Sequence, residues 1–433
     1  MPDLREYLDL LKTNNDLKII KKKANTKFEI ARITSKFNNS RAILFEKIES
    51  SNFKLISNLI GTKNRYAQAI GSNEFNIHST MANAVNNAQE PQVISTGKFT
   101  ANRSRDLSIL PIVTHFEKEP GPFITSSIIT VQNINNNTQN SSFHRLQYLD
   151  NDHLSVRMVE GRHLHKAFVD AKSHGNDLKV AIVIGVHPAI SLSSAYQLDY
   201  NQNEISIANS ILNDKLTLTK CPYTRLYVPS DTEIVLEGII LKDKTHKEWM
   251  VEMLQTYDYV RSQPVFELKQ IYFRNNPIFH DILPGYYEHR LIMGMPIESK
   301  LNNILKTIFP QVKQVCLTDG GCNWLHAVVQ ISKNKQSDPR KIINKIFVLH
   351  RSLKMVTVVD DDINPKDPIS VEYAIATRFQ AKEDLVLIEN VRGSSLDPSS
   401  DQKNLLTSKV GIDATKSFLK RKAGFEIAQI PKF

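Results

Sequence analysis

The sequence has few cysteines, and their arrangement carries no recognisable chemistry. Cys221, Cys316 and Cys322 form no CxxC pair and no paired zinc spacing. Only 15 glycines and 18 prolines occur among 433 residues, which excludes a collagen-like or other fibrous chain. A small disulfide-stapled scaffold is excluded as well, and the scarcity of cysteine is typical of proteins from a reducing compartment.

Long hydrophobic runs are also absent. Runs such as Val180–Val186 are far shorter than the roughly 20 residues that a membrane helix needs. The N-terminus, MPDLREYLDLLKTNNDL, alternates charged residues and leucines at helical spacing. It lacks the apolar stretch and the small-residue cleavage site of a signal peptide. We therefore expect a cytoplasmic protein with no membrane segment.

Basic residues are in excess, but only one run of them, Lys21–Lys23, is tight. The formal net charge of +10 and the pI near 9.2 invite a nucleic-acid partner, because clustered cations displace counterions from phosphates. The run follows an amphipathic segment and is interpreted as a solvated surface. We expect no nucleic acid as partner and instead a small anionic substrate, which a net positive field favours.

The hydrophobic periodicity predicts an opening α/β segment and then a strand-rich middle. Residues 3–14 have helical spacing, and short strand-like runs follow at 42–46 and 54–60. The asparagine-rich tract 134–142 is predicted to be a turn. The next predicted strands form an antiparallel meander with Asn-rich or Asp-rich turns: 127–131, 143–149 and 154–159.

Helices and strands are mixed in the rest of the chain. Predicted helices cover 164–171, 189–196, 205–212, 298–308 and 339–349. Predicted strands cover 179–185, 216–220, 225–228, 233–241, 312–318, 327–331 and 355–359. The alternation of strand and helix after residue 312 predicts a second α/β layer on a sheet. The length of the chain allows two or three domains.

Three groups of residues are candidates for binding a ligand or a metal. NSSFHR places Asn140 and Arg145 at the start of a strand, where a turn can aim both at one ligand; a hairpin Asn with an exposed strand Arg is the plainer interpretation. In GRHLH, His163 and His165 offer imidazoles to a transition metal, although one His alone is usually structural. Glu204 precedes a predicted helix, where a carboxylate either complements the helix dipole or coordinates a hard cation.

Two acidic groups complete the candidates. KEWMVE carries Glu248 and Glu252, which share one face if the segment is helical; a charged surface turn explains it equally well. The run Asp360–Asp362 follows an apolar strand, where it either holds a cation at the carboxyl edge of a sheet or is solvated. Gly320 and Gly321 lack a GxGxxG or GxxxxGKS/T context, and no GxSxG or HExxH motif occurs. A Rossmann or P-loop phosphate site is therefore not supported.

Taken in order along nearly the whole chain, these motifs resemble the UbiD family of reversible decarboxylases. NSSFHRLQYLD is similar to the family's NxGxYRxQxxD. Further family-like blocks follow the family's order: LISNLIGTKNRYAQAIG, KVAIVIGVHPAISLSSA, RLYVPSDTEIVLEGII, QPVFELKQIYFRNNPIFHDILPG, EHRLIMGMP and VTVVDDDINPKDPISVEYAIATR. The resemblance implies an α+β fold with an N-terminal α/β segment (1–100), a central split β-barrel that binds flavin (101–296) and a C-terminal α/β self-association domain (297–433).

The resemblance also implies a cofactor and the residues that hold it. The family uses prenylated FMN, whose phosphate is tied to the protein by Mn²⁺ or Mg²⁺, often with K⁺. Asn140, His163 and Glu204 match the metal-binding residues, and Lys354 matches a cofactor-contacting lysine. Arg145 matches the arginine in the flavin site that engages the substrate carboxylate, for which its planar fork is suited. A separate flavin prenyltransferase supplies the cofactor in the family, and self-association into a homodimer or a higher homo-oligomer is expected.

The acidic motif departs from the family pattern. The family has EGPFGE or EGPFxD, with two acids five residues apart, where this chain has KEWMVE. Aligned on the following TYDYVRSQPV, Glu252 matches the second acid, which would donate the proton, and Lys247 falls at the first. Either Glu248 substitutes for the first acid from the neighbouring position, or the acid–arginine–acid triad is incomplete.

The resemblance implies a carboxy-lyase that acts on an α,β-unsaturated acid. RMVEGRHLHKAF and TYDYVRSQPV look closest to archaeal members, which predicts decarboxylation of trans-anhydromevalonate 5-phosphate to isopentenyl phosphate in a mevalonate pathway. A 4-hydroxybenzoate-type aromatic acid is the alternative substrate. The altered KEWMVE motif also leaves open a catalytically impaired flavin-binding paralogue.

Overall fold

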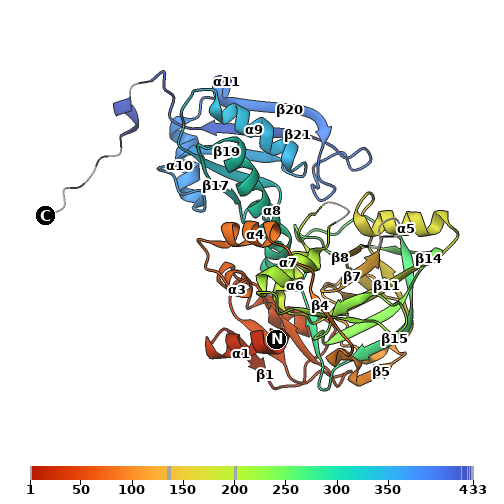
Figure 1. The fold of residues 1–433 in the computed structure, drawn as a ribbon. Helices are drawn as coiled ribbons and strands as arrows, with labels where there is room; N and C mark the ends of the chain where they lie inside the picture. The colour runs from red at the N-terminus through yellow and green to blue at the C-terminus, as the bar shows by residue number, and fades with distance from the viewer. Residues whose placement is uncertain are drawn as a thin grey trace. The chain divides into compact units, whose positions relative to one another are not determined.

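The chain divides into two compact units, Met1–Pro296 and Ile297–Phe433. The computed structural model, drawn in Figure 1, describes residues 2–133, 138–198 and 202–420, together with 422–426, 428 and 430. Part of the asparagine-rich tract, residues 134–137, lies outside the described residues. Within them, no helix is long and apolar enough to cross a membrane.

The first unit opens with helices on a small mixed sheet. Helix α1 (Leu4–Thr13) begins at Asp3, whose carboxylate accepts from the backbone N–H groups of Arg5 and Glu6, as an N-cap does. The sheet has the order β1-β2-β3-β16: β1 (Leu17–Ile20), β2 (Ala42–Phe45), β3 (Lys54–Ser57) and β16 (Ile278–Asp281). Around it lie α2 (Glu29–Ser35), α3 (Lys63–Ala69) and α4 (Ile77–Asn86). The predicted helix and both strands are confirmed, but the fourth strand comes from more than 200 residues downstream.

A curled antiparallel sheet forms the centre of the first unit (Figure 1). Its order is β6-β9-β10-β15-β14-β11-β7-β8, with β5 paired to β15. The strands are β5 (Asn102–Ser104), β6 (Phe123–Ile124), β7 (Ile128–Gln132), β8 (Gln139–Phe143), β9 (Leu146–Tyr148), β10 (His153–Val156), β11 (Leu178–Ile184), β14 (Ile234–Glu248) and β15 (Arg261–Phe273).

The predicted meander is wrong in its connectivity. The hairpin β7–β8 lies at one end of the sheet, whereas β9 and β10 lie toward the other end, with β15, β14 and β11 between them. The chain crosses at residues 144 and 145, between β8 and β9. This crossing places Arg145 at a break between two parts of the sheet.

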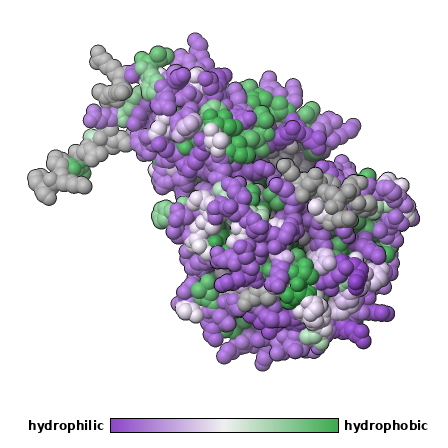
Figure 2. Space-filling model, viewed as in Figure 1, coloured by the Kyte–Doolittle hydropathy of each residue, from purple (hydrophilic) through white to green (hydrophobic). Residues whose placement is uncertain are grey.

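Two hydrophobic cores meet at β11. Alternate residues of a strand point to opposite faces, and Ala181 and Val183 belong to one core while Val180 and Ile182 belong to the other. Burial on both faces explains why this strand reads as one continuous apolar run. Mostly hydrophilic side chains cover the outer face drawn in Figure 2, with smaller apolar patches between them.

Three helices of the first unit pack on or beside β8. Helices α5 (His163–Ser173), α6 (Pro188–Ser194) and α7 (Glu204–Ile211) all contact this strand. A small sheet of β13 (Tyr227–Pro229), β12 (Thr217–Lys220) and β4 (Gln92–Ile94) lies in the same unit, as do the short 3₁₀ turns η1 (Lys98–Ala101) and η2 (Leu107–Ile109). The first residues of α5 and α7 are thereby brought to β8.

The second unit is the α/β layer that the sequence predicts. Its sheet has the order β17-β18-β19-β21-β20: β17 (Val312–Leu317), β18 (His326–Ile331), β19 (Met355–Asp360), β21 (Leu406–Ala414) and β20 (Leu385–Arg392). Strands β18 and β19 are parallel and are connected by α9 (Asp338–Leu349). The other helical segments are α10 (Pro368–Arg378), α11 (Ala381–Asp384) and η3 (Lys422–Phe425).

Helix α8 (Tyr287–Ile308) begins in the first unit and ends in the second. The predicted helix begins at residue 298, eleven residues after the true start of α8. The prediction starts late because Pro296, which usually ends a helix, lies inside α8. The mixed α/β character and the curled central sheet agree with the predicted fold. The domain boundary near residue 100 stays a prediction; β3 and β16, which fall on either side of it, pair with each other.

Candidate active site

Three predicted metal ligands converge beside β8. Asn140 lies on β8, His163 is the first residue of α5, and Glu204 is the first residue of α7. The Asn140 amide nitrogen lies 2.7 Å from Glu204 Oε1 and 2.8 Å from His163 Nδ1, and His163 Nδ1 lies 3.8 Å from Glu204 Oε1. The sequence therefore named three residues that the fold brings to one point.

The donor set at this point fits a divalent metal ion. Glu204 is buried at a helix start, and its second oxygen accepts from the Ser141 backbone N–H at 3.0 Å, which aims the first oxygen at Asn140. An amide oxygen, an imidazole nitrogen and a carboxylate oxygen form a mixed set that suits Mn²⁺ or Mg²⁺. The amide of Asn140 can present its oxygen by rotating half a turn, because the two amide orientations have nearly the same shape.

Strand register decides which acid faces Arg145. Residues that alternate along a strand point to opposite faces, so Lys247 and Glu248 at the end of β14 diverge. Lys247 is exposed, whereas the Glu248 side chain is only 1% exposed and lies on Arg145. Glu248, and not Lys247, is therefore the residue of this pair that contacts Arg145.

Arg145 is enclosed by three carboxylates. Its Nε and Nη2 donate to the two oxygens of Glu248 at 3.2 and 3.0 Å, Nη1 donates to Glu252, and Nη2 also donates to Asp258 at 3.3 Å. Burial opposes the charged form of Arg145, but Glu252 and Glu248 raise its pKa above the ordinary value. The acid–arginine–acid arrangement is therefore present, with a third acid added.

The segment after β14 is neither a helix nor a simple surface turn. Residues 249–260 fold back on themselves through a bridge between Val251 and Tyr257, and Glu252 N–H donates to Thr256 O at 2.8 Å. This fold turns Glu252 and Asp258 toward Arg145. Glu252 keeps 18% of its side chain exposed, more than Glu248 or Asp258.

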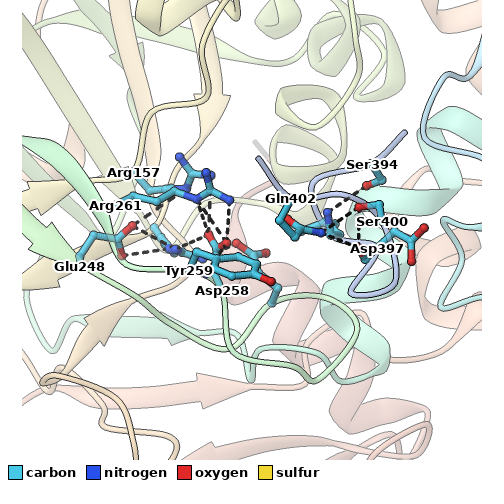
Figure 3. Close-up of polar contacts among 12 residues, drawn as sticks. Arg157, Glu248, Asp258, Tyr259, Arg261, Ser394, Asp397, Ser400 and Gln402 are labelled. Carbon is cyan, nitrogen blue, oxygen red and sulfur yellow. Dashed lines mark hydrogen bonds and ion pairs between the residues drawn. The ribbon is translucent and has the colours of Figure 1, made fainter. Parts of the chain in front are cut away.

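Three residues of this cluster were missed by the sequence reasoning: Asp258, Arg157 and Arg261. Asp258 accepts from Arg261 Nη2 at 3.0 Å and from Arg261 Nε at 3.2 Å (Figure 3). Burial raises the pKa of Asp258, but Arg261 and Arg145 outweigh it and hold the pKa below the ordinary value. Asp258 lies in TYDYVRSQPV, a block that the sequence analysis used for alignment and for similarity but not as a source of site residues. Its charged residues were the available signal.

His144 connects the two groups. Its Nδ1 lies 2.9 Å from Arg157 O, which can only accept, so Nδ1 carries the hydrogen and Nε2 accepts from Ser142 Oγ at 3.0 Å. The Ser142 hydroxyl also lies 3.3 Å from Asn140 Oδ1. Burial lowers the pKa of His144 to about 4, so the imidazole is neutral near pH 7.

Two other predicted sites have partners inside the second unit. Lys354 Nζ lies 2.8 Å from Asp397 Oδ2 and also donates to Ser399; Figure 3 shows Asp397 with Ser394, Ser400 and Gln402 in the turn that carries it. Contact between Lys354 and a flavin stays a prediction.

Cationic side chains of the protein pair with the aspartate run, Asp360–Asp362. Arg378 Nη1 donates to Asp360 at 2.8 Å and to Asp362 at 2.9 Å, and Lys416 pairs with Asp362. The interpretation as solvated loop acids is therefore wrong for Asp360, which is buried, whereas Asp361 and Asp362 are exposed in the turn that follows β19. A bound cation is not needed to explain the burial and charge of Asp360, because Arg378 pairs with it.

Comparison with protein families covers almost the whole chain. Residues 8–85, 88–287 and 290–414 match the N-terminal, Rift-related and C-terminal domains of 3-octaprenyl-4-hydroxybenzoate carboxy-lyase, the three UbiD domains. The anhydromevalonate phosphate decarboxylase of Methanocaldococcus jannaschii is 38% identical over 95% of this chain and 97% of its own. That of Methanosarcina mazei is 37% identical over 99% of both chains.

Solved structures agree with these relatives. The UbiD-class enzyme HmfF from Pelotomaculum thermopropionicum, in complex with FMN, has a TM-score of 0.96 and 33% identity, covering 99% of this chain and 98% of its own. An evolved dimeric form of HmfF in complex with prFMN has a TM-score of 0.92 and 32% identity, covering 99% of this chain and 97% of its own. The chain therefore belongs to the UbiD family of carboxy-lyases.

Proposed function

We propose that this protein is a prenylated-FMN-dependent decarboxylase that converts trans-anhydromevalonate 5-phosphate to isopentenyl phosphate. The observation that carries the proposal is Arg145 held between Glu248 and Glu252, beside the Asn140, His163 and Glu204 group. The names of the relatives from Methanocaldococcus jannaschii and Methanosarcina mazei support this substrate.

The metal ion, Mn²⁺ or Mg²⁺, would be held by Asn140, His163 and Glu204 and would bind the flavin phosphate, with K⁺ as a companion ion in the same site. Lys354 would add a contact to the cofactor. When bound, prenylated FMN supplies the electron sink that decarboxylation at an unsaturated carbon requires. A flavin prenyltransferase would supply that cofactor.

Arg145 and the acids around it would have separate roles in substrate binding and proton transfer. Arg145 would bind and orient the substrate carboxylate, which a planar guanidinium does with two parallel hydrogen bonds. Glu248 is buried and engages two nitrogens of Arg145, so its role is to fix the guanidinium. Glu252 is the more exposed acid and would deliver the proton that replaces CO₂.

A 4-hydroxybenzoate-type aromatic acid is the second candidate substrate, because the matching family models are described as carboxy-lyases of such an acid. A catalytically impaired paralogue is less well supported. The main reason to consider it was an incomplete triad, and Arg145 contacts both Glu248 and Glu252.

Co-expression with a flavin prenyltransferase tests the proposal. The purified protein should show the ultraviolet–visible spectrum of a bound modified flavin and should release CO₂ from trans-anhydromevalonate 5-phosphate in preference to 4-hydroxybenzoate. If the flavin-loaded protein released CO₂ from neither acid, a catalytically impaired paralogue would be the better description.

Replacement of the proton donor tests the assignment of Glu252. Glu252→Gln should keep the flavin spectrum and lose at least about 100-fold in turnover, a general acid's usual contribution. Full turnover by this variant would remove Glu252 from its role.

We further propose that residues 1–100, 101–296 and 297–433 act as an N-terminal segment, a flavin-binding domain and a self-association domain. The evolved dimeric form of HmfF supports homodimers or higher homo-oligomers as an expectation. Sedimentation of the holoprotein at several concentrations, with the mass of the smallest stable species as readout, tests the oligomeric state.

A further inference from the structure

Among the described residues, the guanidinium of Arg157, next to Arg145, forms long ion pairs with carboxylates but donates no hydrogen bond to one. Its Nη2 lies 3.7 Å from Asp258 Oδ2 and its Nε lies 4.0 Å from Glu248 Oε1, both beyond hydrogen-bond distance. Within the described part of the chain, the one hydrogen bond of its side chain joins Nη1 to Met158 O at 2.9 Å. A guanidinium has five N–H donors, so most of the donors of Arg157 are available to a ligand.

Strand pairing sets Arg157 directly opposite Arg145. Val156 pairs with Leu146 between β10 and β9, and the next hydrogen bond joins Arg157 N to Arg145 O. Opposite residues of an antiparallel pair point to the same face of the sheet, with Cβ atoms about 5 Å apart. Two like charges in this position repel each other, so anionic groups that contact both guanidinium groups stabilise the arrangement.

The carboxylates compensate the three arginines unequally. Glu252 and Glu248 raise the pKa of Arg145, and Asp258 raises that of Arg261, whereas burial and the charge of Arg145 lower the pKa of Arg157. Arg157 is only 15% exposed at its side chain, so water does not replace the missing partner fully. Figure 3 shows Arg157 and Arg261 near Asp258; Arg261 donates hydrogen bonds to Asp258, whereas Arg157 approaches it only as an ion pair.

We infer that Arg157 binds the second anionic group of the substrate, the phosphate, while Arg145 binds the carboxylate. This inference rests on the proposed function. In trans-anhydromevalonate 5-phosphate a short chain separates the carboxylate from the phosphate. Two guanidinium groups at the ends of neighbouring strands can therefore bind one anionic group each. A planar guanidinium binds phosphate through two parallel hydrogen bonds, so Arg157 would select a phosphorylated acid over an unphosphorylated one.

Steady-state kinetics of the flavin-loaded enzyme test this with two substrates, the phosphorylated acid and the same acid without phosphate. Arg157→Gln should raise the KM of the phosphorylated acid about 10- to 100-fold, the scale of lost hydrogen bonds to a charged group. The kinetics of the unphosphorylated acid should not change. Arg157→Lys keeps the charge without the fork and should give an intermediate KM. Arg103→Gln, at an exposed arginine on β5, is the matched control and should behave as wild type.

A binding measurement separates this inference from the proposed function. Inorganic phosphate titrated into flavin-loaded protein by calorimetry should bind the wild type and the Arg103→Gln variant, and more weakly the Arg157→Gln variant. Equal binding by all three, an equal loss of activity on both acids, or loss of flavin from Arg157→Gln would overturn the phosphate subsite. A wild type that binds phosphate at Arg157 but releases no CO₂ from the phosphorylated acid would overturn the proposed function alone.

Discussion

Glu248 makes the largest set of contacts that fixes Arg145, and it does so from a buried position at the end of β14. Glu248→Gln removes the charge and one of the two parallel contacts. We expect the variant to retain flavin, to lose about 1–3 kcal/mol of stability, and to have a lower kcat/KM because the guanidinium is less well held. Stopped-time CO₂ assays and thermal unfolding measure the two effects.

Lys247→Gln is the matched control for this change. It alters the adjacent residue, which is exposed and points to the opposite face of the strand. Wild-type kinetics are expected for it. If Lys247→Gln impaired turnover as much as Glu248→Gln, the assignment of the first acid would be wrong.

His115 should make the free energy of unfolding of the first unit decrease at alkaline pH. Its Nε2 lies 2.9 Å from Asp281 Oδ1, and both side chains are almost fully buried. Burial opposes protonation, but Asp281 and Glu119 raise the pKa of His115 to about 9. A pKa raised above the unfolded value of about 6.5 means that this stabilisation is complete below pH 6.5 and is lost as pH rises toward 9.

The expected result is a free energy of unfolding that falls between pH 6.5 and pH 9 in the wild type. The slope should be smaller in His115→Gln, which has no proton to release. Denaturant titrations at pH 6, 7.5 and 9 measure the slopes, and parallel slopes for the two proteins would contradict the assignment. His174→Gln is a suitable control, at an exposed histidine that follows α5.

The resemblance of the sequence to the family names Asn140, His163 and Glu204, which the fold brings together, whereas the sequence could not settle the acid pair. The predicted helices begin one residue after His163 and one after Glu204, but Asn140 lies in a tract that the sequence predicts as a turn. The choice between Lys247 and Glu248 depends on strand phase, and the predicted strand stopped at Leu241, seven residues short of the end of β14. The register of β14 also shifts between Ile240 and Thr245, so alternation in the first part of the strand does not give the direction of the Glu248 side chain.

At the scale of elements, β14 and β15 form the longest pairing of the curled sheet, and its register shifts twice, between Glu237 and Gly238 and between Ile240 and Thr245. A side chain at Gly238 would meet the Glu267 carbonyl oxygen at 2.1 Å and the Phe266 ring at 2.6 Å. The carbonyl belongs to the paired strand and cannot move aside. Gly238→Ala should therefore lower stability by about 1–3 kcal/mol through overpacking.

Thermal unfolding of Gly238→Ala measures this effect. Gly320→Ala is the comparison, because a side chain at Gly320 meets no atom within 4 Å. An unfolding temperature equal to that of the wild type in Gly238→Ala would show that the strand pair can open at this position to accept a methyl group.

Strand β8 shows why part of the sheet escaped prediction. Its residues, Gln139–Phe143, have polar side chains that favour turns, and the sequence predicted a turn through residue 142. Pairing with β7, for example Val131 with Asn140, overrides that local preference. The non-sequential strand order depends on contacts far apart in the chain, which local periodicity does not contain.

At the scale of the whole molecule, metal and flavin should be lost together. Removal of the divalent ion with EDTA, or His163→Ala, should abolish the flavin spectrum and the release of CO₂. Added Mn²⁺ should restore both after EDTA but not in the variant. His165→Ala, two residues further along α5, should retain both, and a flavin spectrum unchanged in EDTA would remove the metal from the cofactor site.

Strand β16 makes the opening sheet of the first unit depend on residues 278–281. A ribosome has released β1, β2 and β3 long before it reaches this strand, so β3 has an unpaired edge for more than 200 residues of synthesis. Such an edge is a template for intermolecular pairing. A fragment ending near residue 100 should aggregate, and chaperone demand during translation should persist until β16 is available.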